Sequence, residues 1–119
     1  MKHLRQHELD TAERLADLGD DVKFIPATSD GRRADVEIDD MLWELKSPTS
    51  SNRNTITTRL GRGARQSANI TFDISRTRIS IADAMEIAED VLRRYPEVAV
   101  IRLVGRDTQS GPLDVLIRR

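Results

Sequence analysis

The chain has 119 residues, of which 38% are hydrophobic and 33% are charged, and its formal net charge is −1 at pH 7. This length suits a single domain with one modest core, and we expect residues 1–119 to form one. The lack of cysteine excludes disulfides and thiolate zinc sites. No apolar run approaches the ~18 residues of a membrane span. The N-terminus also lacks the apolar stretch of a signal peptide.

A helix and three strands are predicted for the first 46 residues. Apolar residues recur at helical spacing in residues 3–18, which predicts an amphipathic helix that ends at Gly19. Short strands are expected over residues 22–26, 34–38 and 41–46. The last two are predicted to form a hairpin, with its turn at Asp39-Asp40.

Two helices and three strands are predicted for the rest of the chain. Residues 47–58 are polar and are expected to be a mobile connection. The next helix is predicted from apolar residues at i, i+4 spacing, which are Ile56, Leu60, Ala64 and Ala68. A third helix follows the capping residue Ser80 and stops at Tyr95. Strands are expected over residues 70–74, 98–104 and 113–117. The order α-β-β-β-α-β-α-β-β predicts an α/β fold with a central mixed sheet flanked by helices.

Two carboxylates and one lysine on the predicted hairpin carry the most chemical information. Side chains alternate along a strand, so Glu44 and Lys46 project from one face, whereas Trp43 points into the core. Asp35, near the far end of the preceding strand, can approach them across the turn. Magnesium binds through one or two carboxylates plus waters and substrate phosphate, a role that suits Asp35 and Glu44. Lys46 can position the attacking water or neutralise charge on the phosphorus.

These residue types also have ordinary explanations. Glu-x-Lys is common on the solvated face of a strand, and a chain that is one-third charged produces such spacings by chance. Arginine nevertheless outnumbers lysine by 16 to 3, which makes Lys46 unusual for this chain. Glu8 lies on the apolar side of the first predicted helix. It either forms a salt bridge, turns to solvent, or points into the site as a further ligand.

A basic segment follows the hairpin. From Arg53 to Arg78 there are six arginines and one acid, Asp73, which gives a local charge of +5. The second predicted helix carries a polar stripe that consists of Arg59, Arg62, Gln66 and Asn69. This stripe is either a solvated helix face or a set of phosphate contacts, which would position a nucleic acid without reading its sequence.

Taken together, the chain resembles nucleases of the PD-(D/E)XK superfamily and, more narrowly, the tRNA-cleaving C-terminal toxin domains of contact-dependent growth inhibition (CdiA) proteins. The resemblance is carried by His7–Ala12, Leu15–Gly19, Asp35, Trp43–Pro48 and Ala64–Asn69. It implies a restriction-endonuclease-like core. It also implies that Asp35 and Glu44 bind the metal, that Lys46 is the catalytic lysine, that Glu8 is an additional acid from the helix, and that Gln66 is a polar site position. Ala34 departs from the signature, which has proline there.

The resemblance further implies a function and its partners. We expect a metal-dependent endoribonuclease toxin that cleaves tRNA, uses Mg²⁺ or else Mn²⁺ or Zn²⁺, and is neutralised by a cognate immunity protein. It would be the C-terminal part of a larger secreted or cell-surface protein and would act in the cytoplasm of a competing bacterium. Two alternatives stay open. One is a DNA endonuclease with the same site, since nothing in the sequence reads a 2′-hydroxyl. The other is a non-catalytic module that binds nucleic acid or protein.

Overall fold

The computed structural model describes residues 6–24, 36–38, 40–64, 67–108 and 111–118. Its elements follow the predicted order. The helices are α1 (Gln6–Asp17), α2 (Arg53–Gly63) and α3 (Ile81–Arg94). The strands are β1 (Val22–Phe24), β2 (Val36–Ile38), β3 (Met41–Lys46), β4 (Asn69–Asp73), β5 (Val100–Thr108) and β6 (Gly111–Arg118). The predicted α/β fold with a mixed sheet is confirmed.

The six strands form one sheet in the order β1-β2-β3-β4-β5-β6. β3, β4 and β5 run parallel, whereas the other neighbours are antiparallel. The two parallel connections pass through α2 and α3, as a crossover between parallel strands requires. β3 and β4 therefore end at the same edge of the sheet, with Lys46 paired to Phe72 just before that edge.

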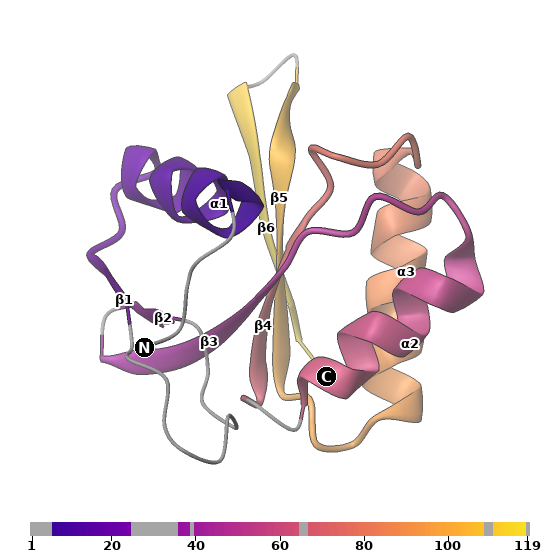
Figure 1. Ribbon diagram of the computed structural model, residues 1–119. Coiled ribbons are helices and arrows are strands. Elements are labelled where there is room, and N and C mark those ends of the chain that lie inside the picture. The colour runs from indigo at the N-terminus through magenta and orange to yellow at the C-terminus, as the bar shows by residue number, and fades with distance from the viewer. Residues whose placement is uncertain (1–5, 25–35, 39, 65–66, 109–110, 119) are drawn as a thin grey trace.

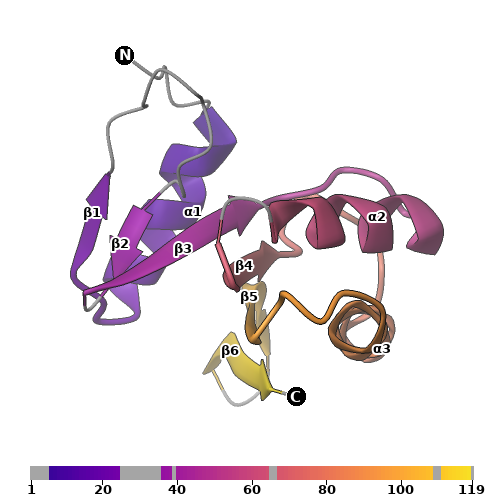
Figure 2. The same cartoon turned by 90° about the horizontal axis from the view of Figure 1, so that it is seen from below.

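Helices cover both faces of the sheet (Figure 1). α2 and α3 lie on one face, where Phe72 belongs to a buried cluster that also contains Leu60 and Val91. α1 lies on the other face, where its fully buried Leu15 packs with Trp43 and Leu45. Figure 2 shows α1 beside the β1–β3 end of the sheet and α2 and α3 beyond β4. The two buried clusters thus lie on opposite faces of the sheet, and β5 contributes residues to both.

α1 ends as the sequence predicts. Gly19 adopts a φ of 100°, a conformation that glycine reaches at little cost. The amide of Gly19 donates to the carbonyl of Ala16, and that of Asp20 donates to the carbonyl of Leu15. This pair of hydrogen bonds closes a helix terminus with a left-handed glycine, so the chain reverses towards β1.

α2 differs from the prediction at both ends. Residues 53–58 are helical rather than a connection, because Asn52 caps the helix by accepting from the amide of Thr55 at 3.0 Å. The helix ends at Gly63, so Ala68 is not part of it. Apolar spacing misplaces the start because neither Asn52 nor the polar first turn contributes to an apolar stripe. It misplaces the end because Ala68 continues the spacing beyond the last helical residue.

α3 begins and ends as predicted. The Ser80 hydroxyl accepts from the amide of Asp83 at 3.0 Å, and Tyr95 stands at the C-terminal cap. The Tyr95 ring packs against α2 at Gly61, where a Cβ atom would lie only 2.2–2.5 Å from three ring atoms. Gly61 is therefore a close-approach site between the two helices.

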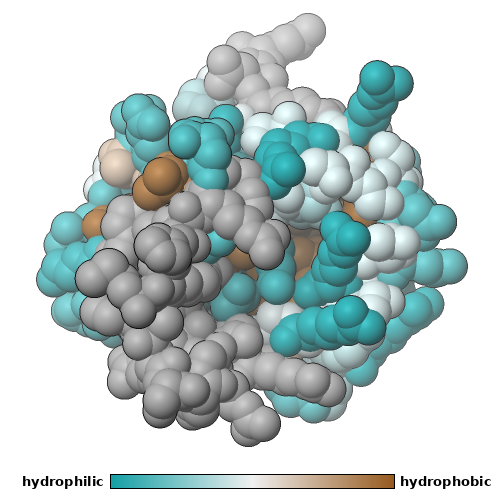
Figure 3. Space-filling model, viewed as in Figure 1, coloured by the Kyte–Doolittle hydropathy of each residue, from teal (hydrophilic) through white to brown (hydrophobic). Residues whose placement is uncertain are grey.

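The surface over α2 and α3 is mainly hydrophilic in Figure 3, with only small apolar spots between polar side chains. Within the described residues, no helix combines the length and the apolar character that crossing a bilayer requires.

Candidate active site

Glu44 and Lys46 lie together on one face of β3. The Lys46 ammonium nitrogen is 3.7 Å from Oε1 of Glu44. Glu44 is 6% exposed, whereas the Lys46 side chain is 31% exposed and reaches the surface. Because Trp43 and Leu45 point towards α1, the alternation of the strand directs the pair towards α2. The predicted shared face and the predicted core position of Trp43 are both confirmed.

The last turn of α2 packs directly on this pair. A Cβ atom at Gly63 would lie 3.2 Å from Cε of Lys46 and 3.3 Å from Cγ of Glu44. It would also lie 3.4 Å from Cδ1 of Ile70, which pairs with Glu44 between β4 and β3. The absence of a side chain at Gly63 lets the helix approach the two charged side chains this closely.

Glu8 is 8% exposed on α1, so its predicted place on the buried side of the helix is confirmed. It lies seven residues, about two turns, before Leu15 and shares its helix face. Glu8 therefore approaches the sheet from the side of Trp43 and Leu45, whereas Glu44 and Lys46 project towards α2.

Two further predicted site residues are Asp35, in the predicted hairpin, and Gln66, which follows α2. Both lie outside the described residues. Val36, which follows Asp35 in the sequence, pairs with Trp43, which precedes Glu44. In the described part of the chain β2 pairs with β3 only from Met41 to Trp43. The edge of β3 that faces β2 therefore has no described partner strand at Glu44–Lys46, whereas the opposite edge pairs with β4 there.

Arg59 and Arg62 are exposed on α2, as the predicted stripe requires. No described acidic side chain forms an ion pair with either of them. Arg53 differs, because its guanidinium lies 2.9 Å from Glu86 and 3.6 Å from Asp83 of α3. Arg59 and Arg62 are thus available to a ligand, whereas Arg53 joins α2 to α3.

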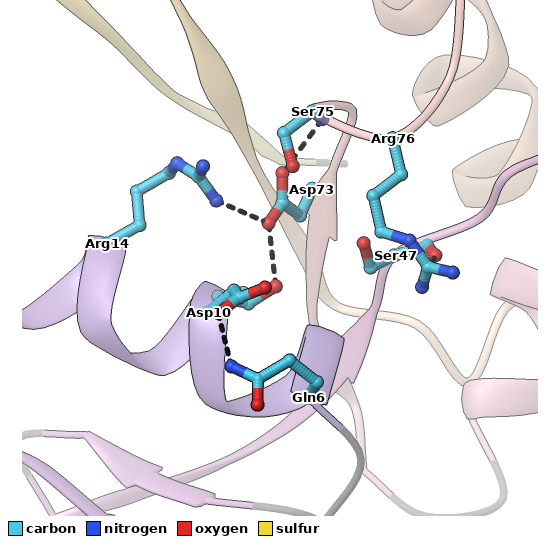
Figure 4. Close-up of polar contacts among 8 residues, drawn as sticks. Gln6, Asp10, Arg14, Ser47, Asp73, Ser75 and Arg76 are labelled. Atoms are coloured by element: carbon cyan, nitrogen blue, oxygen red, sulfur yellow. Dashed lines mark hydrogen bonds and ion pairs between the residues drawn. The ribbon is translucent and has the colours of Figure 1, made fainter.

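A cleft of about 470 Å³ opens on the opposite face, between α1 and the edge at which β3 and β4 end. Asp73 lines the cleft and is 1% exposed, and Figure 4 shows its polar contacts. Oδ2 of Asp73 accepts from the Thr11 hydroxyl at 2.6 Å and from Arg14 at 2.8 Å. Oδ1 accepts from the amide of Ser75 at 2.9 Å. These contacts attach α1 to the end of β4.

The cleft adjoins the candidate pair through the backbone, because Ser47 lines it and directly follows Lys46. Arg76 donates to the carbonyl of Ser47 at 3.1 Å and is itself exposed (Figure 4). Asp10, Glu13 and Asp17 of α1 make the opposite rim acidic. The side chains suited to phosphodiester chemistry point to the other face of the sheet, so we place the candidate site at Glu44 and Lys46 rather than in the cleft.

Sequence reasoning missed the roles of Asp73 and Arg76. Asp73 is the only acid between Arg53 and Arg78, which was a usable signal, but its partners are 62 and 59 residues away. Arg76 belongs to the basic segment, yet its contact with Ser47 depends on the ends of β3 and β4 meeting. Such pairings follow from topology rather than from local pattern.

A second buried ionic group lies on β5 and β6, away from Glu44 and Lys46. Arg102 binds Asp114 through two hydrogen bonds, of 2.7 and 2.8 Å, and also donates to Asp20. The hydrogen bond to Asp114 is the main cause of a raised pKa for Arg102, and the bond to Asp20 adds to it, while desolvation lowers the pKa. This group joins the end of α1 to the sheet.

The described residues do not by themselves complete a metal site. Among them, no three or more histidine, cysteine, aspartate or glutamate side chains form a group that can hold an ion. Glu44 supplies one carboxylate with an adjacent cation. Mg²⁺ needs only one or two protein carboxylates when water and phosphate supply the other oxygens, so the donor chemistry of Glu44 fits a magnesium ion.

Comparisons with known proteins identify a family and a similar fold. The family described as contact-dependent growth inhibition CdiA C-terminal domain matches residues 32–108. Among solved structures, a similar chain belongs to the CdiA-CT/CdiI toxin and immunity complex from Burkholderia pseudomallei, with a TM-score of 0.74 and 19% sequence identity. The similarity covers 95% of this chain and 83% of that one, and at this identity it concerns the fold. Curated protein sequences gave no match.

Proposed function

This chain belongs to the family of contact-dependent growth inhibition CdiA C-terminal domains, and from that premise we propose that it is a metal-dependent nuclease toxin that cleaves tRNA. The observation that carries the proposal is the Glu44–Lys46 pair. A buried carboxylate lies 3.7 Å from a lysine ammonium group that reaches the surface at the end of β3. The spacing is that of the Glu-x-Lys signature of PD-(D/E)XK nucleases, whose core we propose this sheet represents.

Glu44 and Asp35 are the proposed ligands of a magnesium ion. A bound ion of this kind polarises a phosphoryl oxygen and lowers the pKa of a coordinated water. The low exposure of Glu44 supports this role, because a buried carboxylate needs a compensating charge. Glu8 is proposed as a further acid of the site on the resemblance alone, because α1 packs on the Trp43–Leu45 face of β3 whereas Glu44 and Lys46 project towards α2.

Lys46 is the proposed catalytic cation. Its ammonium group is fixed near the carboxylate of Glu44 yet remains accessible, so it can contact a phosphodiester that approaches the surface. There it can neutralise the charge that develops on the phosphoryl oxygens, or orient the water that attacks phosphorus. Either role requires the positive charge of Lys46 and is lost when the ammonium group is removed.

Arg59 and Arg62 are the proposed backbone contacts for the tRNA, with Gln66 as a further polar contact on the same segment. Both arginines are exposed on α2, whose last turn packs on the catalytic pair. Contacts of this kind hold phosphates without reading bases. The acidic rim of α1 lies on the opposite face, which favours an approach of the polyanion from the α2 side.

The family also suggests a biological setting. We propose that the domain is the C-terminal part of a larger secreted or cell-surface protein and acts in the cytoplasm of a competing bacterium. The chain with the similar fold belongs to a toxin and immunity complex, which supports a cognate immunity protein as the partner of this domain.

A substrate panel tests the activity. The purified protein is incubated with total bacterial tRNA and, separately, with duplex DNA, each with Mg²⁺, Mn²⁺, Zn²⁺ or a chelator. The proposal predicts cleavage of tRNA that requires a divalent ion, with duplex DNA left intact. Cleavage of DNA alone would replace tRNA by DNA as the substrate. No cleavage of either with any ion would leave a non-catalytic binding module as the function.

A further inference from the structure

We propose that Gly63 is a positioning residue that sets the geometry of the Glu44–Lys46 pair. The catalytic part of this proposal rests on the proposed function. Its structural basis is the position of Gly63 in the last turn of α2, where a side chain would contact both Glu44 and Lys46.

The two contacts at Gly63 leave too little room for a methyl group unless a neighbour shifts slightly. Separations of 3.2 Å to Cε of Lys46 and 3.3 Å to Cγ of Glu44 are shorter than ordinary carbon–carbon contacts. The third neighbour, Cδ1 of Ile70 at 3.4 Å, closes the side opposite the helix. A Cβ atom at this position must therefore displace Lys46, Glu44 or the helix turn by a few tenths of an ångström.

The buried surroundings decide which group moves. Ile70 is fully buried and Glu44 is 6% exposed, so both are held by the core. The Lys46 side chain is 31% exposed and has the most freedom. A methyl group at position 63 therefore acts mainly on Lys46, and it changes the distance between the ammonium group and the carboxylate without breaking the fold.

Gly61 supplies a matched control on the same helix. It is also buried, but a Cβ atom there meets the Tyr95 ring rather than the charged pair. Gly61→Ala therefore disturbs the packing of α2 on α3, whereas Gly63→Ala disturbs the candidate site. The same chemical change, two residues apart, separates a general packing effect from a positioning effect.

The test compares Gly63→Ala, Gly61→Ala and the double variant Gly63→Ala/Ile70→Val in the full chain, with Ile70→Val alone as reference. Cleavage of tRNA at saturating Mg²⁺ gives kcat and KM, and a thermal melt reports folding. Small misplacements of catalytic groups are costly, so we expect kcat of Gly63→Ala to fall about tenfold with KM within about twofold. Removing Cδ1 of Ile70 gives the turn space, and should restore part of the lost kcat. Gly61→Ala should keep the wild-type kcat at temperatures below its own melting temperature.

A second readout does not depend on activity. The ¹³C chemical shift of the Lys46 ε-methylene should change in Gly63→Ala and stay constant in Gly61→Ala. An unchanged shift, or a folded Gly63→Ala with wild-type kcat, would overturn the positioning role. Failure of the wild-type protein to cleave any substrate would instead overturn the proposed function, and the chemical shift would still decide the role of Gly63.

Discussion

The Thr11 hydroxyl donates to Oδ2 of Asp73 at 2.6 Å and joins α1 to the end of β4, 62 residues later in the chain. Both residues are at most 1% exposed. Thr11→Val removes one of three donors to a buried carboxylate at little change in volume. A hydrogen bond to a charged group contributes about 1.5–3 kcal/mol, and we expect a loss of that size in the free energy of unfolding by urea, with Arg14 still donating to Oδ2. A loss below about 0.5 kcal/mol would show that α1 is held mainly by its apolar contacts.

Gly61→Ala should destabilise the protein through Tyr95. A Cβ atom 2.2–2.5 Å from the ring forces it to shift, and overpacking of this kind costs about 1–3 kcal/mol. In a Tyr95→Ala background the ring is absent, so the same substitution should be neutral or stabilising by up to about 1 kcal/mol, because alanine favours helix. A double-mutant cycle in urea checks this. Equal effects in both backgrounds would contradict the contact.

Arg102→Met should remove a buried cation that two aspartates require. Breaking such a group costs about 3–5 kcal/mol, and we expect about 3 kcal/mol, the lower end of that range, because the side chain of Asp114 is 33% exposed. The raised pKa of Arg102 stabilises the folded state at every pH below the ordinary pKa of arginine. That stabilisation is lost only as the pH rises through the folded-state pKa, far above neutral pH. The loss on substitution should therefore be equal at pH 6 and pH 9. A clear difference between them would assign it to another titrating group.

Arg59→Ala and Arg62→Ala should weaken binding of tRNA more than they weaken catalysis. Each substitution removes one phosphate contact. A plot of the logarithm of the binding constant against the logarithm of the salt concentration should therefore become less steep, by about 0.7–0.9 in slope per arginine. Binding is measured on a Lys46→Ala background, which prevents cleavage. Arg93→Ala is the control, because Arg93 is exposed on α3 and pairs with Asp90. A decrease of the same size for Arg93 would mean that the effect is not specific to α2.

The order of the elements could be predicted from the sequence because each is recorded in a local pattern. Gly19 and Ser80 act on neighbouring residues, and β3 alternates along its own length, so its bounds and the common face of Glu44 and Lys46 are confirmed. The start of α2 was predicted wrongly because Asn52 begins the helix within a polar stretch, where no apolar stripe marks it.

The environment of the candidate site could not be predicted in the same way. The contact of Gly63 with Lys46 depends on how the crossover from β3 to β4 returns the helix to the sheet. The burial of Asp73 depends on α1, which no local pattern connects to β4. The metal-binding role of Asp35 and the substrate contact of Gln66 stay predictions, as do the chemical roles of Glu8, Glu44 and Lys46.

The rate of tRNA cleavage by Glu44→Gln and Lys46→Ala at saturating Mg²⁺ tests most directly whether these two side chains catalyse the reaction. The matched controls are Glu89→Gln and Lys23→Ala, which change exposed residues of α3 and β1. With the fold verified by thermal melting, we expect both site variants to lose at least about a hundredfold in kcat and both controls to keep the wild-type rate. Site variants that remain folded and cleave within about threefold of the wild type would contradict this expectation.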